Sequence, residues 1–234
     1  MRIRVPIVDF HSHIIPCVDH GSASAEQSEK MLLQAKKAGV AAVVATPHFY
    51  PSMETVASFL QRRNKCLSIL ENYLAEKDSK GISIIAGAEV AVEKELLSVE
   101  NLKDLCIGDT NYILMEMPKS DVFYSWMYDF LYHVEADAGL KVILAHVDRY
   151  STKNMRRLLD MGFVAQVNAS SLVHRKRRRE LLRYCEEGAI ELIGSDAHND
   201  KDRGYAPLIA CGKRIDPQVL SGFYRASIDI LSGK

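Results

Sequence analysis

The sequence lacks an excess of charge of either sign, a long apolar run and a secretory leader pattern. Lys and Arg together number 30, as do Asp and Glu, so the formal net charge is zero. Such a chain has no overall attraction to nucleic acid or to an anionic membrane. No stretch approaches the roughly 18 consecutive apolar residues of a membrane-spanning helix, and the N-terminus lacks a charged-then-apolar signal. We expect a cytoplasmic protein without a nucleic-acid partner and without stable membrane insertion.

Clustered cysteines and glycine-rich loops are also missing. The five cysteines are scattered, none forms C-x-x-C, and none has an arginine six positions on, as a cysteine-based phosphatase loop requires. We expect reduced thiols that pack mostly as small hydrophobic side chains. Neither G-x-G-x-x-G nor G-K-[ST] follows an apolar strand, which excludes the usual dinucleotide and P-loop sites.

Apolar runs of strand length alternate with segments of helical period along the whole chain. The expected strands are residues 4–10, 41–46, 82–88, 112–115, 141–145, 163–167 and 190–194. The expected helices are residues 24–38, 54–78, 121–138, 153–160, 177–187 and 216–231, with one or two short helices within 93–109. Continuous apolar strands are typical of parallel sheets covered on both faces. We predict an α/β fold with one domain over residues 1–234, a closed or nearly closed (β/α) barrel, with a doubly wound open sheet as the alternative.

Metal-ligating side chains follow these strands. The set comprises six of the eight histidines and three carboxylates: His11, His13, His20, His48, Glu89, Glu116, His146, Asp196 and His198. The carboxyl ends of parallel barrel strands form one rim, where active sites lie. We therefore expect the nine donors to converge. The other two histidines, His133 and His174, fall in helical or loop stretches and are expected to be ordinary.

Nine nitrogen and oxygen donors exceed the requirement of one catalytic metal, which commonly takes about three protein ligands. They suit two or three ions. Because no thiolate is among them, manganese, iron or zinc with nitrogen and oxygen ligands is favoured over a cysteine-type zinc site. The expected cofactor is Mn²⁺, with iron, zinc or magnesium as alternatives. A network of this kind without metal would cost several kcal/mol in desolvation. Neighbouring metal ions suit phosphate-ester hydrolysis, and Arg149 and Arg203 could bind phosphate oxygens as bidentate clamps.

Five segments carry a resemblance to a known family: residues 9–14, 87–89, 145–150, 166–168 and 195–199. They include the H-x-H of His11 and His13 and the D-x-H of Asp196 and His198. In this order they resemble the PHP (polymerase and histidinol phosphatase) family. Within it the chain is most similar to the bacterial manganese-dependent tyrosine-protein phosphatases of capsule and exopolysaccharide loci.

The resemblance implies a distorted seven-stranded (β/α) barrel with three metal ions and attack of a metal-bound hydroxide on phosphorus. One implied ligand set is His11, His13, Glu89 and Asp196; a second is Glu89, Glu116 and His146; the third is His20, His48 and His198. Arg149 and Arg203 would hold the phosphoryl oxygens. The implied partner is a phosphotyrosine protein, the tail of a bacterial tyrosine kinase. His20 stands where the subgroup often has aspartate, so an imidazole replaces a negative charge.

Two other functions stay open at this point: a PHP phosphoesterase for a small metabolite such as histidinol phosphate, and a catalytically silent metal-binding module. The basic run at residues 174–179 is either the solvated start of a helix or an electrostatic guide for an anionic partner, such as a phosphotyrosine-rich tail or a membrane surface. No feature of the sequence specifies an interface for an oligomer.

Overall fold

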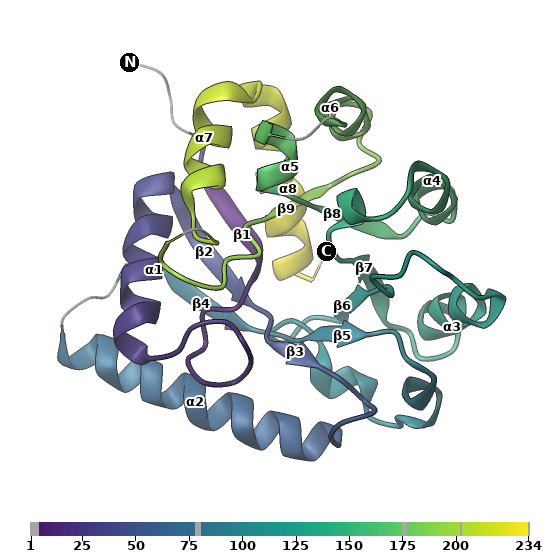
Figure 1. Ribbon diagram of the computed structural model, residues 1–234, viewed down its shortest axis with the longest axis horizontal. Coiled ribbons are helices and arrows are strands. Elements are labelled where there is room, and N and C mark those ends of the chain that lie inside the picture. Colours follow the sequence, from purple (N-terminus) through teal and green to yellow (C-terminus); the bar gives the residue numbers. More distant parts are fainter. Residues whose placement is uncertain (1–4, 78–80, 175–176, 202, 234) are drawn as a thin grey trace.

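Parallel strands form the interior of the protein, whose computed structural model describes residues 5–77, 81–174, 177–201 and 203–233 (Figure 1). One sheet has the order β1 (Ile7–Ser12), β2 (Val40–Ala45), β4 (Ser83–Ala86). The other has the order β3 (His48–Phe49), β5 (Glu89–Ala91), β6 (Tyr112–Glu116), β7 (Lys141–Leu144), β8 (Val164–Asn168), β9 (Leu192–Gly194). Every pairing within the sheets is parallel, as the continuous apolar runs predicted.

Helices surround these strands, and the last helix lies behind them (Figure 1). The α-helices are α1 (Ala25–Ala38), α2 (Val56–Glu76), α3 (Ser125–Ala136), α4 (Thr152–Asp160), α5 (Ala169–His174), α6 (Arg178–Glu186), α7 (Ala206–Arg214) and α8 (Pro217–Leu231). Three 3₁₀ turns are η1 (Lys94–Ser98), η2 (Leu102–Leu105) and η3 (Val147–Arg149). All six expected helices are confirmed, and η1 and η2 fill the less regular stretch. Helices α5 and α7 were not expected. The ends of two expected elements, Arg4 and Asp78, lie outside the described residues.

The first helix illustrates how sequence signals set the element boundaries. The Ser24 hydroxyl accepts a hydrogen bond from the backbone N–H of Gln27 at 3.2 Å, and the Gln27 side chain accepts one from Ala23 N–H at 2.7 Å. These bonds satisfy donors that the first helical turn leaves free. Gly39 ends α1 with φ at 87°, a left-handed conformation that glycine adopts without steric cost.

Backbone hydrogen bonds join the two sheets into one curled wall. The carbonyl of His11 accepts from Asp196 N–H at 2.8 Å, and His13 N–H donates to the carbonyl of Ala197 at 2.9 Å, so β1 meets the segment after β9. On the other side Gly108 N–H, shortly before β6, donates to the carbonyl of Ala86 in β4 at 2.7 Å. The α/β class with a curled parallel sheet is confirmed. The count of seven strands is not, because the described residues form nine short strands in two sheets.

A small apolar cluster fills the interior of the curled wall. Val8, Phe10, Val44 and Leu114 are at most 1 % exposed, and Ile230 of α8 packs against them from behind. Fully burying a side chain of this kind stabilises the fold by about 1.5–3 kcal/mol. The larger core lies between the strands and the surrounding helices. Because apolar side chains occupy the interior, the polar side chains gather at the carboxyl ends of the strands.

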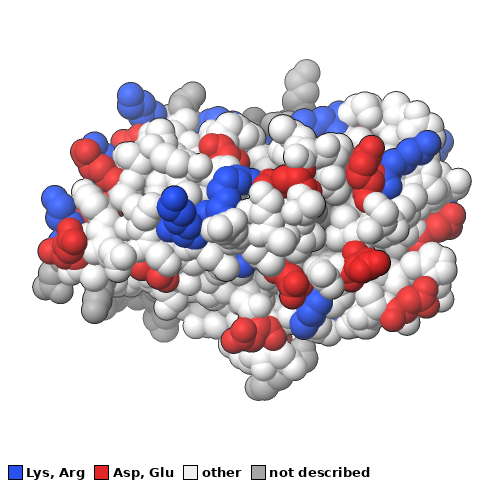
Figure 2. Space-filling view, turned by 90° about the horizontal axis from the view of Figure 1, so that it is seen from below, with Lys and Arg blue, Asp and Glu red and all other residues white. Residues whose placement is uncertain are grey.

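The outer surface mixes both signs of charge. In Figure 2, Lys and Arg side chains stand beside Asp and Glu side chains across the face shown. This mixture agrees with the formal net charge of zero. Among the described residues, no helix combines the length and the hydropathy needed to cross a bilayer.

Candidate metal centre

The nine predicted donors come together at the carboxyl ends of the strands. His11 lies in β1 and His13 just after it, His48 and Glu89 begin β3 and β5, and Glu116 ends β6. The remaining donors follow β1, β7 and β9: His20, His146, Asp196 and His198. Eight of the nine are buried, and His20 is exposed. The carboxyl ends of the strands thus carry a buried cluster of imidazoles and carboxylates.

Glu89 lies at the middle of the cluster. Its Oε2 is 3.1 Å from His11 Nε2, 3.3 Å from His13 Nε2 and 3.1 Å from His48 Nδ1. Its Oε1 is 2.8 Å from His146 Nε2. One carboxylate therefore contacts four imidazoles: two lie in strands β1 and β3, and two lie in the segments that follow β1 and β7. This position suits a ligand shared between two ions.

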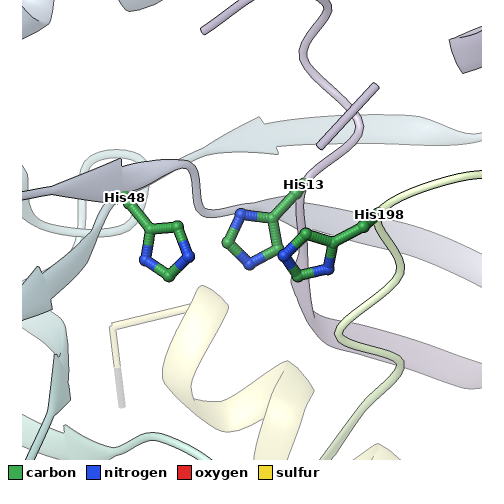
Figure 3. Close-up of side chains that lie close together, drawn as sticks. All are labelled: His13, His48 and His198. Atoms are coloured by element: carbon green, nitrogen blue, oxygen red, sulfur yellow. The ribbon is translucent and has the colours of Figure 1, made fainter. Parts of the chain in front are cut away.

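A second group of imidazoles lies beside the first. The rings of His48, His13 and His198 stand in a row with His13 in the middle (Figure 3). The ring centroids of His13 and His198 are 4.0 Å apart, and those of His13 and His48 are 4.6 Å apart. His198 Nε2 is also 3.0 Å from His20 Nε2. His20 thus joins the cluster through His198 and through His48, on whose ring it stacks with the centroids 4.8 Å apart.

Ligand atoms within 4.8 Å of one another form three groups among the described residues. The groups are His11, His13 and Glu89; His48, Glu89 and Glu116; and His13, His48 and His198. Asp196 lies close to the first group, with its Oδ1 3.4 Å from His13 Nε2 and 3.8 Å from His11 Nε2. His146 lies close to the second, 3.3 Å from Glu116 Oε1.

Two donors are held by strained backbone. His146 has φ at 32° and Asp196 has φ at 51°, a region that residues with a side chain rarely adopt. Such strain costs about 1–3 kcal/mol and persists where the surrounding structure imposes it, often at functional sites. Close packing beside these donors requires Gly194, because a Cβ there would lie 2.6 Å from both Gln166 Nε2 and the Cβ of His11. Only glycine lets β9 approach β1 and β8 this closely.

Buried donor atoms without a hydrogen-bond partner support a metal-binding role. Among the described residues, His48 Nδ1, Glu89 Oε2, Glu116 Oε1 and His146 Nδ1 are buried and make no well-aligned hydrogen bond, although the first three have another donor atom within 3.3 Å. Leaving such an atom unsatisfied costs about 1–3 kcal/mol. Three of these four atoms lie between other donors, where a cation would satisfy them together. The donor set therefore fits metal ions with a preference for nitrogen and oxygen ligands.

The electrostatics of the site favour lone pairs and negative charge. Burial lowers the pKa of His48 to about 4 and that of His198 to about 3, so both imidazoles are neutral at pH 7. Burial alone would raise the pKa of Glu89, but the charge and hydrogen bonds of His11 outweigh it and hold the pKa well below its usual range. His146 is the exception: burial opposes its protonation, yet the neighbouring carboxylates of Glu116 and Glu89 raise its pKa to about 9, so a metal ion would have to displace its proton.

Asp19 orients two donors, a role that the sequence did not reveal. Its Oδ2 lies 2.7 Å from His13 Nδ1 and accepts from His48 N–H at 2.9 Å, and its Oδ1 accepts from Gly21 N–H at 2.8 Å. Burial raises the pKa of Asp19, but the hydrogen bond to His13 outweighs it and lowers the pKa strongly. A proton on Nδ1 of His13 leaves the lone pair on Nε2, which faces Glu89.

Gln166 and Asn168 of β8 support the other side of the cluster. Gln166 Oε1 lies 3.1 Å from His11 Nδ1 and accepts from His146 N–H at 2.7 Å. Asn168 donates to Asp196 Oδ2 at 3.2 Å. Both lie in the segment 166–168, where the resemblance points to the site but assigns them no role.

The two predicted arginines stand at the open edge of the site. Arg149 bonds Asp196 through Nη2, its Nη1 is 3.8 Å from Glu116 Oε1, and its side chain is 29 % exposed. Arg203 is exposed, with Nη2 3.0 Å from His198 Nε2. The structure therefore brings both guanidinium groups to the donors while leaving them open to solvent.

The described part of the basic run and His133 lie outside the donor cluster. Arg175 and Lys176 lie outside the described residues, as does the side chain of His174. Arg177 bonds the carbonyl of Tyr150 at 2.6 Å and Glu180 at 2.8 Å, which ties α6 to the loop that carries Arg149. His133 is exposed on α3 and pairs with Asp137 at 2.7 Å.

The fold and the site define the class of protein: a parallel α/β chain with a buried cluster of histidines and carboxylates that could hold metal ions. The family model described as capsular polysaccharide synthesis, CpsB/CapC matches residues 7–220, and the chain belongs to this family. The resemblance drawn from the sequence is thereby confirmed.

Individual relatives agree with this assignment. Tyrosine-protein phosphatase CpsB of Streptococcus agalactiae serotype III (strain NEM316) is 25 % identical over 209 residues, which cover 82 % of this chain and 83 % of the relative. Tyrosine-protein phosphatase YwqE of Bacillus subtilis (strain 168) is 25 % identical over 213 residues, covering 85 % and 80 %.

A solved structure shows the same fold. It comes from work on YwqE from Bacillus subtilis and CpsB from Streptococcus pneumoniae, described as unique metal-dependent tyrosine phosphatases. It aligns with a TM-score of 0.80 at 23 % identity, over 97 % of this chain and 95 % of that one.

Proposed function

We propose that this chain is a metal-dependent protein-tyrosine phosphatase, formed by one domain over residues 1–234. The single observation that carries the proposal is the buried cluster around Glu89, whose unpartnered donor atoms lie beside two solvent-open arginines. The family membership supports it, because the relatives are named tyrosine-protein phosphatases. Cys17 and the four other cysteines are free, so no disulfide bond contributes to the proposed site.

The proposed metal ligands are the nine donors of the cluster, and manganese is the proposed ion. His11, His13, Glu89 and Asp196 would hold one ion, and Glu89 with Glu116 and His146 a second. His48 and His198 with His20 would hold a third, and the row in Figure 3 supports adding His13 to that group. Bound metal ions would lower the pKa of water and neutralise charge that develops on the phosphoryl oxygens.

The protein side chains would bind and orient the phosphate. Arg149 is held against Asp196 and Glu116, so its guanidinium is directed at the donors before a substrate arrives. Arg203 approaches the donors through His198, 3.0 Å from its Nε2. A guanidinium matches two phosphate oxygens with two hydrogen bonds, and two such forks would fix the ester in one orientation. The buried imidazoles would exclude bulk water behind the phosphate.

Three finer features belong to the same proposal. Only residues 46–47 separate β2 from β3, and only residues 87–88 separate β4 from β5, which supports a distorted seven-stranded barrel in which each pair counts as one strand. The proposed substrate is the phosphotyrosine tail of a bacterial kinase that regulates capsule synthesis, in keeping with the family description. The proposed location is the cytoplasm, where the five free cysteines would stay reduced.

The test is one panel of substrates assayed on protein purified with manganese, beside a chelated control. The panel holds a phosphotyrosine peptide, a phosphoserine peptide and histidinol phosphate. We expect hydrolysis of the phosphotyrosine peptide to exceed the others, to stop on chelation and to return with added manganese. Preference for histidinol phosphate would replace the proposal with a metabolite phosphoesterase. Inactivity on all three with metal bound would leave a silent metal-binding module.

A further inference from the structure

A second, apolar hollow lies beside the proposed metal centre. It has a volume of about 570 Å³ and is lined by Val92, Glu93, Lys94, Pro118, Tyr124, Trp126 and Met127. Its residues come from the loops after β5 and β6 and from the start of α3. In Figure 1, α3 lies outside β6, next to the ends of these strands. None of its residues belongs to the donor cluster or to the arginines.

Backbone connects the hollow directly to the cluster. Val92 N–H donates to the carbonyl of Glu116 at 2.9 Å, and Pro118 follows Glu116 by two residues. An extended chain covers about 3.3 Å per residue, so two residues separate the donor from the wall of the hollow by roughly 7 Å. A polypeptide that presents a phosphotyrosine at the cluster would therefore pass the hollow two or three residues away.

Exposed apolar side chains concentrate at the same edge. Of the nine large hydrophobic side chains that are exposed among the described residues, four stand in the neighbouring loops after β3, β5 and β6. They are Met53 (79 % exposed), Leu97 (58 %), Val122 (52 %) and Tyr124 (58 %). The side chain of Ser52 bonds Glu93 at 2.6 Å, which ties the loop of Met53 to the loop that forms the hollow. Apolar surface gathered in one place marks an interaction site more often than scattered residues do.

We infer that this hollow, which we call the flanking pocket, binds an apolar side chain two or three residues from the phosphotyrosine of a protein substrate. The inference rests on the proposed function and adds a sequence preference to it. Val92 and Met127 form an apolar floor that is at most 5 % exposed, and Trp126 and Tyr124 form an aromatic wall. Glu93 and Lys94 line the same pocket with opposite charges, so apolar contact rather than charge would select the side chain.

The experiment compares phosphotyrosine peptides that carry leucine or glycine two and three residues from the phosphotyrosine on either side. Burial of one leucine favours binding by about tenfold, and we expect the wild-type kcat/KM to be higher for the leucine peptide by that factor. Two variants test the pocket. Trp126→Ala opens the wall, and Tyr124→Ser removes the exposed ring while placing a favoured residue at the N-cap of α3, where Tyr124 makes no capping bond.

Both variants should reduce the ratio of kcat/KM for the leucine peptide to kcat/KM for the glycine peptide to near one. Each rate is expressed relative to turnover of p-nitrophenyl phosphate by the same variant. The matched control is Tyr132→Ser, the same change at an exposed tyrosine of α3 that does not line the pocket. It should keep the tenfold ratio. Equal rates on all peptides by wild type, or an unchanged ratio in both variants, would overturn the inference and leave the phosphatase function standing.

Two further results separate the remaining explanations. If no phosphotyrosine substrate is hydrolysed, including free phosphotyrosine, the proposed function fails and the flanking pocket fails with it. Sedimentation of wild type and Tyr124→Ser tests whether a second copy of the chain occupies the hollow. A dimer that Tyr124→Ser dissociates, with no change in the peptide ratio, would assign the surface to self-association and overturn the inference.

Discussion

The inner and outer parts of the candidate site differ sharply in their surroundings. His11, His13, Glu89 and His146 are at most 1 % exposed and contact one another within 3.3 Å. His20, Arg149 and Arg203 stand at the open edge. The inner donors gain nothing from water, so their lone pairs and charges must be satisfied inside the protein. The outer groups are open to solvent on one side, where a ligand can reach them, although Arg149 is also bonded to Asp196.

This difference assigns separate tasks to the two parts. The inner donors are fixed by packing, strained backbone and partners such as Asp19, which is how a protein preorganises a metal site. The outer groups keep the freedom to bind and release a substrate. Substitution of an inner donor should therefore remove bound metal and activity together, whereas substitution of an outer group should act mainly on the handling of substrate.

The largest effect is expected from His11→Ala. The change removes an inner nitrogen that lies 3.1 Å from Glu89 Oε2, so bound manganese should fall and hydrolysis of p-nitrophenyl phosphate should drop to background. The fold should persist, since the apolar core is untouched. Metal content, turnover and far-ultraviolet circular dichroism check these three points. His133→Ala on the outside of α3 is the control, and retained metal with retained activity in His11→Ala would contradict the division into two parts.

Asp19→Asn should have the next largest effect. The amide keeps the size of the side chain but loses the negative charge that holds His13 and the backbone of His48. Loss of such a partner typically weakens metal affinity by about 10- to 100-fold. Competition with a chromophoric chelator measures the affinity directly, without reliance on turnover. An affinity equal to wild type would show that packing alone orients His13.

Arg149→Lys should reduce kcat/KM for a phosphotyrosine peptide by about 30-fold while leaving the metal content unchanged. Lysine keeps the charge but loses the planar fork, and one charge-assisted hydrogen bond is worth about 2 kcal/mol. An effect of that size converts to roughly 30-fold in rate. Steady-state kinetics and metal analysis on the same preparation separate the two readouts. Loss of metal in this variant would place Arg149 with the inner part.

The sequence predicted much of the fold and most of the donors because the patterns that indicate them are local in the chain. Apolar runs located the interior strands, Ser24 and Gln27 located the start of α1, and the donors stand directly after strands whose ends must meet. The short strands β3 and β5 have only two and three residues, which is too few to show the alternating or continuous apolar pattern that predicts a strand. Helix α7 has Pro207 in its first turn and Gly212 inside it, residues that indicate a loop.

The partners of the donors could not be predicted, because they depend on contacts between distant parts of the chain. His11 and Gln166 are 155 positions apart, and an amide in a strand has no pattern that marks it as an orienting group. Asp19 lies beside His20, and the sequence alone does not show which of these two adjacent side chains is a donor and which orients a donor. The structure separates them: Asp19 bonds His13 at 2.7 Å, whereas His20 meets His198 at the edge.

The smallest effect is therefore expected from His20→Ala, and it gives the sharpest test of the inner–outer distinction. His20 is exposed and lies 3.0 Å from His198 Nε2, a contact that Arg203 also makes at 3.0 Å. Its ring also stacks on that of His48, with the centroids 4.8 Å apart. Because Arg203 remains in place and solvent already reaches the edge, the loss should stay below about tenfold in metal affinity and in kcat/KM, under about 1.4 kcal/mol. His48→Ala is the matched comparison: it removes an imidazole of the same row whose side chain is 4 % exposed and lies 3.1 Å from Glu89. Chelator competition on both variants should give a much larger loss for His48→Ala, and equal losses would mean that burial does not decide which imidazole holds the metal.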